Sequence, residues 1–93
     1  FRSARARELG GYLAERLEQM PRVREVRGLG LMIGVELTIA NKPVLERMMD
    51  RGLLGVAAGT HVVRFLPPLN ITRAEADQAL ARFGKALDDC GNG

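Results

Sequence analysis

The chain of 93 residues begins with apolar positions at helical spacing. Four apolar residues follow one another at intervals of four, four and three: Leu9, Leu13, Leu17 and Met20. This spacing places them along one face of an amphipathic helix. The pattern ends at Pro21, because proline has no N–H for a helical hydrogen bond. We therefore expect the first helix over residues 3–19.

A second helical pattern lies near the end of the chain, with apolar residues at intervals of four, three and four: Ala76, Leu80, Phe83 and Leu87. Thr72 and Glu75 come just before it or at its start. They have the spacing of a capping box, in which each side chain bonds the backbone N–H of the other residue. The last helix is therefore expected to begin just after Thr72.

Between these helices the first patterns are those of strands. Val23 and Val26 flank charged residues, and the glycine-containing segment 27–30 follows. Residues 31–37 then form a mostly apolar run, which is typical of a buried strand. We expect two short strands joined by a glycine turn.

One more helix and two more strands follow. The helix is expected to begin at residues 41–43, because a proline in the first turn loses no hydrogen bond. Gly52 is a typical helix stop. Residues 53–57 and 61–66 are expected to pair as a hairpin. The apolar face of the helix would consist of Val44, Leu45, Met48 and Met49.

These elements add up to one α+β domain over residues 1–93, in the order α-β-β-α-β-β-α. Helices are expected to cover one face of a small, largely antiparallel sheet in a two-layer arrangement. We detect no internal repeat, low-complexity run or interior linker.

Arg64 is the leading candidate for contact with a ligand. It interrupts the apolar run VVRFLPPL at residues 62–69. A guanidinium is costly to desolvate without a partner, so a strand that carries one here exposes it to water or offers it to an anion. Pro67 and Pro68 would end the strand directly afterwards. We therefore expect Arg64 near a strand end.

Composition limits the remaining possibilities. The net charge of +3 comes mostly from arginines in the first part of the chain, but glutamates are interleaved with them. A solvated helix face therefore explains them better than a nucleic-acid surface, which would also offer aromatic residues for stacking.

No apolar run approaches the roughly 18 residues of a membrane span, and we expect a cytoplasmic protein. Because the chain starts at Phe1, we expect a piece of a longer protein.

Three segments together resemble the C-terminal part of class III aminotransferases. They are VRGLGLMIGVEL at residues 26–37, GLL at 52–54 and VRFLPPL at 63–69. The resemblance extends from about residue 7 to residue 87 and is nearest to the acetylornithine and ornithine aminotransferase group. It implies the C-terminal small domain of a fold-type I enzyme, usually a homodimer, that depends on pyridoxal 5'-phosphate.

The resemblance also implies that the active site is shared between this domain and a large domain. In the family, a large domain supplies the lysine that binds the cofactor covalently and an aspartate for its pyridine nitrogen, and neither motif is found here. Lys42 and Lys85 are expected to face solvent, where a lysine is a poor nucleophile near neutral pH.

The family's arginine at the position of Arg64 binds a carboxylate of glutamate or 2-oxoglutarate. The implied partners are amino-acid and 2-oxo-acid substrates and the large domain of the same chain, with no nucleic acid and no membrane. Taken alone, these residues are expected to be inactive.

The other candidates are interpreted structurally. Arg27 at the glycine turn could line a domain interface, although a solvated or structural arginine fits better. The glycines at 28, 30 and 34 have the wrong spacing for a dinucleotide loop. His61 has no second ligand at metal-binding spacing and is expected to be packed or at a sheet edge. Glu36 is interpreted as a strand-end charge, and Cys90 as an incidental thiol in a polar tail.

Three alternatives remain open. Arg64 could form a structural ion pair across a domain interface instead of binding a substrate. The domain could be a stand-alone small-molecule-sensing module, with the glycine turn at a ligand interface. It could also be a basic nucleic-acid-binding module.

Overall fold

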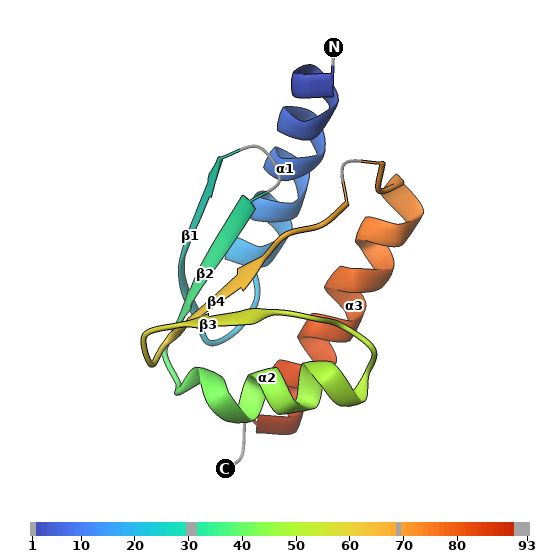
Figure 1. Cartoon of the computed structure of the whole chain (residues 1–93). Coiled ribbons are helices and arrows are strands. Elements are labelled where there is room, and N and C mark those ends of the chain that lie inside the picture. Colours follow the sequence, from blue (N-terminus) through green and yellow to red (C-terminus); the bar gives the residue numbers. More distant parts are fainter. Residues whose placement is uncertain (1, 30–31, 69, 91–93) are drawn as a thin grey trace.

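The structure is a computed structural model that describes residues 2–29, 32–68 and 70–90. Within these residues, helices and strands follow the expected order of an α+β domain (Figure 1). The elements are α1 (Arg2–Glu18), β1 (Val23–Leu29), β2 (Met32–Leu37), α2 (Asn41–Asp50), β3 (Val56–Ala58), β4 (Val62–Phe65) and α3 (Arg73–Cys90). The expected order α-β-β-α-β-β-α is therefore confirmed. The turn at Gly30 and Leu31, and Leu69 of the proline motif, lie outside the described residues.

The strands form one antiparallel sheet in the order β1-β2-β4-β3. The two hairpins, β1-β2 and β3-β4, therefore meet through β2 and β4, which are adjacent in space but separated by α2 in the sequence. The register between them pairs Gly34 with Arg64 and Val35 with Val63. This pairing places residues of both hairpins on common faces of the sheet.

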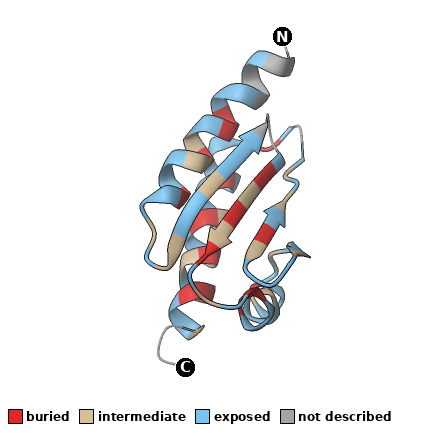
Figure 2. Ribbon diagram, turned by 90° about the vertical axis from the view of Figure 1, so that its left-hand side faces the viewer, coloured by how far each residue is buried: buried red, intermediate tan, exposed pale blue. Residues whose placement is uncertain are grey.

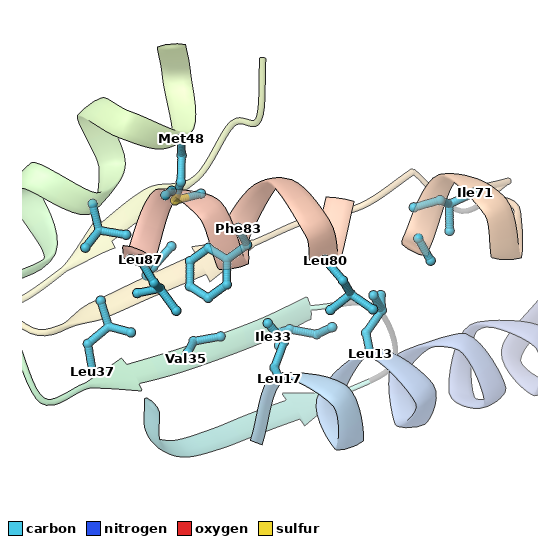
Figure 3. Packing of buried hydrophobic residues seen from close by; sticks show 14 of the residues in the cluster. Leu13, Leu17, Ile33, Val35, Leu37, Met48, Ile71, Leu80, Phe83 and Leu87 are labelled. Carbon is cyan, nitrogen blue, oxygen red and sulfur yellow. The ribbon is translucent and has the colours of Figure 1, made fainter. Parts of the chain in front are cut away.

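All three helices contribute to the hydrophobic core on one face of the sheet. On β2, Ile33, Val35 and Leu37 are buried, whereas the residues between them point to the other face. Figure 2 shows this alternation, with the sheet lying in front of α1. Figure 3 shows side chains of α1 and α3 meeting those of β2. The buried residues of the helices include Leu13, Leu17, Val44, Met48, Leu80, Phe83 and Leu87.

The last helix begins as the sequence predicts. The backbone N–H of Glu75 donates to Thr72 Oγ1 at 3.1 Å, and the backbone N–H of Thr72 donates to Glu75 Oε1 at 2.9 Å. This capping box satisfies two donors that the first turn of a helix leaves without a partner. Phe83 on this helix packs edge-on against Phe65 of β4, with ring centroids 5.0 Å apart.

The expected strand at residues 53–57 is wrong at its start, because β3 begins only at Val56. The N–H of Leu53 donates to Met48 O at 2.8 Å and so closes the end of α2 instead of joining a sheet. Gly55 then passes so close to α2 that a Cβ there would lie 2.7 Å from Met48 Cε. Gly52 has φ +75, as expected of a helix stop.

Two further expectations are corrected. His61 lies exposed in the turn before β4, where its ring Nδ1 lies 2.8 Å from Thr60 Oγ1, so it is neither packed nor part of a strand. Cys90 is the last residue of α3 and not part of a polar tail. It packs against the core, and burial raises the pKa of its thiol.

None of the helices in the described residues is long and apolar enough to cross a membrane.

Candidate functional site

Arg64 lies on the exposed face of the sheet, opposite the helices. It is the third of the four residues of β4, near the strand end as expected. Its pairing partners are Gly34 on β2 and Val56 on β3. On the far side of Gly34, β1 contributes Arg27. The strand order thus aligns two arginines in one row across the sheet, with a residue that has no side chain between them.

A hollow of about 500 Å³ lies along this row, and we call it the open-face hollow. Its lining includes both arginines and two glutamates of the neighbouring row, Glu25 and Glu36. Gly34 is not needed for backbone geometry, since a Cβ there would make only ordinary contacts, 3.8 Å from Arg27 O and 3.9 Å from Val62 Cγ1. Its effect is to leave the space between the arginines free.

The two arginines of the hollow differ in their partners. Arg27 Nε donates to Glu25 Oε2 at 2.5 Å. This hydrogen bond holds the pKa of Glu25 below its usual value of 4.5 and raises the pKa of Arg27. Within the described residues, the side chain of Arg64 takes part in no hydrogen bond or ion pair. Arg64 is therefore the guanidinium of this row that is available to an external anion.

Glu36 also has a local partner. Its Oε2 lies 3.8 Å from Arg24 Nη1, and both side chains are substantially exposed. Exposed ion pairs of this kind contribute little to stability, because solvent screens them. From the sequence, Glu36 was interpreted as a strand-end charge. In the structure its side chain also lines the hollow that contains Arg64.

A buried asparagine, Asn41, helps to fix the position of β4. From the sequence it was interpreted only as the start of a helix. Asn41 Nδ2 donates to Gly59 O at 3.1 Å and to Val62 O at 2.8 Å. Its backbone N–H donates to Thr60 O at 2.8 Å. The first residue of α2 thus holds the β3–β4 turn and the start of the strand that carries Arg64. An asparagine before a helix-starting proline gives no sequence signal of this role.

The other candidates lie apart from Arg64. Lys42 and Lys85 are exposed, as expected, and neither lines the open-face hollow. His61 and Cys90 do not line it either. Arg27 was expected at a glycine turn but lies within β1 and does line the hollow. Sequence reasoning missed Glu25 as its partner, although two oppositely charged residues two apart in a strand share a face.

Comparison with known proteins places the whole domain in one family. The family model for class-III aminotransferases matches residues 3–87. The [LysW]-aminoadipate semialdehyde transaminase of Deinococcus radiodurans is 48% identical over 87 residues, which cover 90% of this chain and 20% of that protein. The acetylornithine aminotransferase of Listeria monocytogenes is 40% identical over 87 residues, covering 94% of this chain and 22% of that protein.

Solved structures agree with the sequence relatives. The N-acetylornithine aminotransferase from Stenotrophomonas maltophilia superposes with a TM-score of 0.83 at 32% identity, over 96% of this chain and 27% of that one. The lysine aminotransferase from M. tuberculosis, determined in the internal aldimine form, gives 0.83 at 34% identity, over 91% of this chain and 21% of that one. The chain thus spans about a fifth of the length of the first two relatives.

Proposed function

The chain belongs to the class-III aminotransferases, and we propose that it supplies the substrate-carboxylate arginine of an acetylornithine-type enzyme. The enzyme would transfer an amino group between an ω-amino donor and 2-oxoglutarate. The observation that carries this proposal is the state of Arg64, which is exposed on the open face and has no side-chain partner among the described residues. The neighbouring Arg27 is already engaged by Glu25.

An arginine suits this task for a geometric reason. Its planar fork makes two parallel charge-assisted hydrogen bonds to one carboxylate, which fixes the orientation of the substrate as well as its position. Orientation matters because transamination needs the reacting nitrogen and Cα at a defined place over the cofactor. The exposed position of Arg64, beside the space above Gly34, leaves room for a carboxylate to approach.

The open-face hollow does not fit the covalent binding of pyridoxal 5'-phosphate. That cofactor is held through a lysine amine, and no described residue that lines the open-face hollow is a lysine. We therefore assign the cofactor to the part of the enzyme beyond these residues and expect the 93 residues alone to be inactive. We also propose that the complete enzyme is a cytoplasmic homodimer that serves arginine biosynthesis.

The test is the substitution Arg64→Lys in the complete enzyme, because lysine keeps the charge but loses the fork. We expect kcat/KM for 2-oxoglutarate to fall by roughly 10- to 100-fold, as for the loss of a hydrogen bond to a charged group. The fold should remain intact by circular dichroism. Arg7→Lys, at an exposed position of α1, is the matched control and should leave turnover unchanged.

The main competing role for Arg64 is a structural ion pair with another part of the enzyme. In that case Arg64→Lys would lower the unfolding midpoint while the KM for 2-oxoglutarate stayed at its original value. Unchanged turnover together with unchanged affinity for 2-oxoglutarate would rule out the carboxylate role.

A further inference from the structure

Glu36 is the carboxylate of the open-face hollow that lies nearest to Arg64 in the register of the sheet. It lies two residues beyond Gly34 on β2, and Gly34 is the pairing partner of Arg64. Glu36 and Arg64 are therefore diagonal neighbours on one face, and such neighbours are about 7–8 Å apart, within reach of two long side chains. Both side chains line the hollow. Glu36 is thus placed to act on the arginine that is open to an external anion.

The other carboxylate of the hollow is already compensated. Glu25 lies directly opposite Glu36 in the sheet, and like charges in this arrangement repel each other. Glu25 accepts a hydrogen bond from Arg27 Nε at 2.5 Å. The partner of Glu36 is looser, because Arg24 Nη1 lies 3.8 Å from its Oε2, which is too long for a hydrogen bond. Glu36 is therefore the less compensated of the two carboxylates.

The charge of Glu36 acts across the hollow. The pKa of Arg27 is raised mainly by the hydrogen bond and charge of Glu25, and the charge of Glu36 raises it further. Gly34 pairs with Arg27 on one side and with Arg64 on the other. Glu36, two residues along from Gly34, is therefore a diagonal neighbour of both arginines. The same charge acts on Arg64 over a similar distance.

A β-bulge supplies the partner of Glu36. The register of β1 against β2 shifts between Val23 and Glu25, so Arg24 is an extra residue of β1. Bulges re-aim side chains, and the guanidinium of Arg24 comes within ion-pair distance of Glu36. Arg24 itself does not line the hollow. It can therefore draw Glu36 away from Arg64 without meeting a ligand there.

We propose that Glu36 determines how tightly the open-face hollow holds a carboxylate substrate, and that Arg24 moderates Glu36. The negative charge of Glu36 opposes a carboxylate bound at Arg64, and the ion pair with Arg24 limits this opposition. The inference rests on the proposed function, because it takes the ligand of Arg64 to be a carboxylate. Uniformly tight binding lowers KM without raising kcat, so a residue that loosens the bound carboxylate does not oppose catalysis.

The first experiment measures carboxylate binding without chemistry. Glutarate, a dicarboxylate with no oxo group, serves as a competitive inhibitor against 2-oxoglutarate in the complete enzyme. In Glu36→Gln we expect its Ki to fall by roughly threefold to tenfold, as for the removal of a charge about 7 Å away in a solvated site. Glu15→Gln, at an exposed position of α1, is the matched control and should leave Ki unchanged. An unchanged or higher Ki in Glu36→Gln would overturn the proposal.

The dependence on salt separates charge from shape. Exposed charges are screened by salt, and at about 1 M the Debye length is about 3 Å. The ratio of Ki between the original enzyme and Glu36→Gln should therefore approach one at that concentration. A ratio that does not change with salt would mean that the substitution acts through packing, which contradicts the proposal. Circular dichroism should show an intact fold, because the exposed ion pair with Arg24 contributes little to stability.

A double-mutant cycle tests the role of Arg24. Arg24→Gln alone should raise the Ki of glutarate, because Glu36 is then free to turn toward Arg64. In the Glu36→Gln background the same substitution should have at most a small effect, since Arg24 then has no carboxylate to hold. An equal rise in both backgrounds would show that Arg24 acts directly on the ligand, and its assigned role would be wrong.

These measurements fail separately from the proposed function. A Ki that rises in Arg64→Lys but does not respond to Glu36→Gln would keep the carboxylate role of Arg64 and remove that of Glu36. A Ki that is the same in Arg64→Lys as in the original enzyme would remove the carboxylate role itself, and the role of Glu36 with it.

Discussion

Arg27 and Arg64 lie on either side of Gly34, in one row across three strands on the exposed face of the sheet. Because neighbouring strands are about 4.8 Å apart, the two Cα atoms are separated by roughly 10 Å. Glu25 engages the first arginine, and the second is open. The row therefore offers a guanidinium beside a free space, and Gly34 determines the size of that space.

Gly34→Val should place two methyl groups in the space between Arg27 and Arg64. The new Cβ would make only ordinary contacts, and β-branched residues suit strands. We expect kcat/KM for 2-oxoglutarate in the complete enzyme to fall by roughly tenfold or more, since a small misplacement of substrate is costly, whereas Gly34→Ala should have a smaller effect. Gly11→Ala, on an exposed part of α1, is the glycine control. Full activity of Gly34→Val would show that the carboxylate does not lie over position 34.

The hydrogen bond and charge of Arg27 should keep Glu25 ionised to a lower pH than an isolated glutamate. Because Arg27 lowers the pKa of Glu25 below 4.5, the ionised pair stabilises the fold above that pH, and this contribution is lost as the pH falls through the lowered pKa. In Arg27→Gln we expect the pKa of Glu25, followed by NMR of the carboxyl carbon, to rise toward 4.5. Arg7→Gln should leave it unchanged. An equally low pKa in Arg27→Gln would mean that another group holds Glu25 ionised.

Local signals in the sequence were enough for most of the fold. The start of α3 depends on Thr72 and Glu75, which are three residues apart, and the end of α2 depends on a glycine with positive φ. Both features are visible in a short window of sequence. The start of β3 was predicted wrongly because the N–H of Leu53 closes the end of α2 instead of joining the sheet. An apolar run alone does not show which of these two hydrogen bonds the N–H makes.

The open-face hollow depends on relationships that no short window contains. Arg27 and Arg64 are in one row only because β2 pairs with β4 across the intervening α2. The register that sets Gly34 between them follows from which residues of both strands face the core. The sequence could therefore single out Arg64 as a charge within an apolar strand, but it could not supply Arg27, Glu25 and Glu36 as its neighbours.

The capping box at Thr72 gives a prediction about stability that is independent of the site. Thr72→Ala removes the oxygen that accepts the N–H of Glu75, so we expect the free energy of unfolding to fall by about 1 kcal/mol. Urea unfolding of the 93-residue chain, followed by circular dichroism, measures this change. Thr72→Ser keeps the accepting oxygen and should lose much less. Equal losses in both variants would mean that the threonine methyl group, and not the cap, stabilises the start of α3.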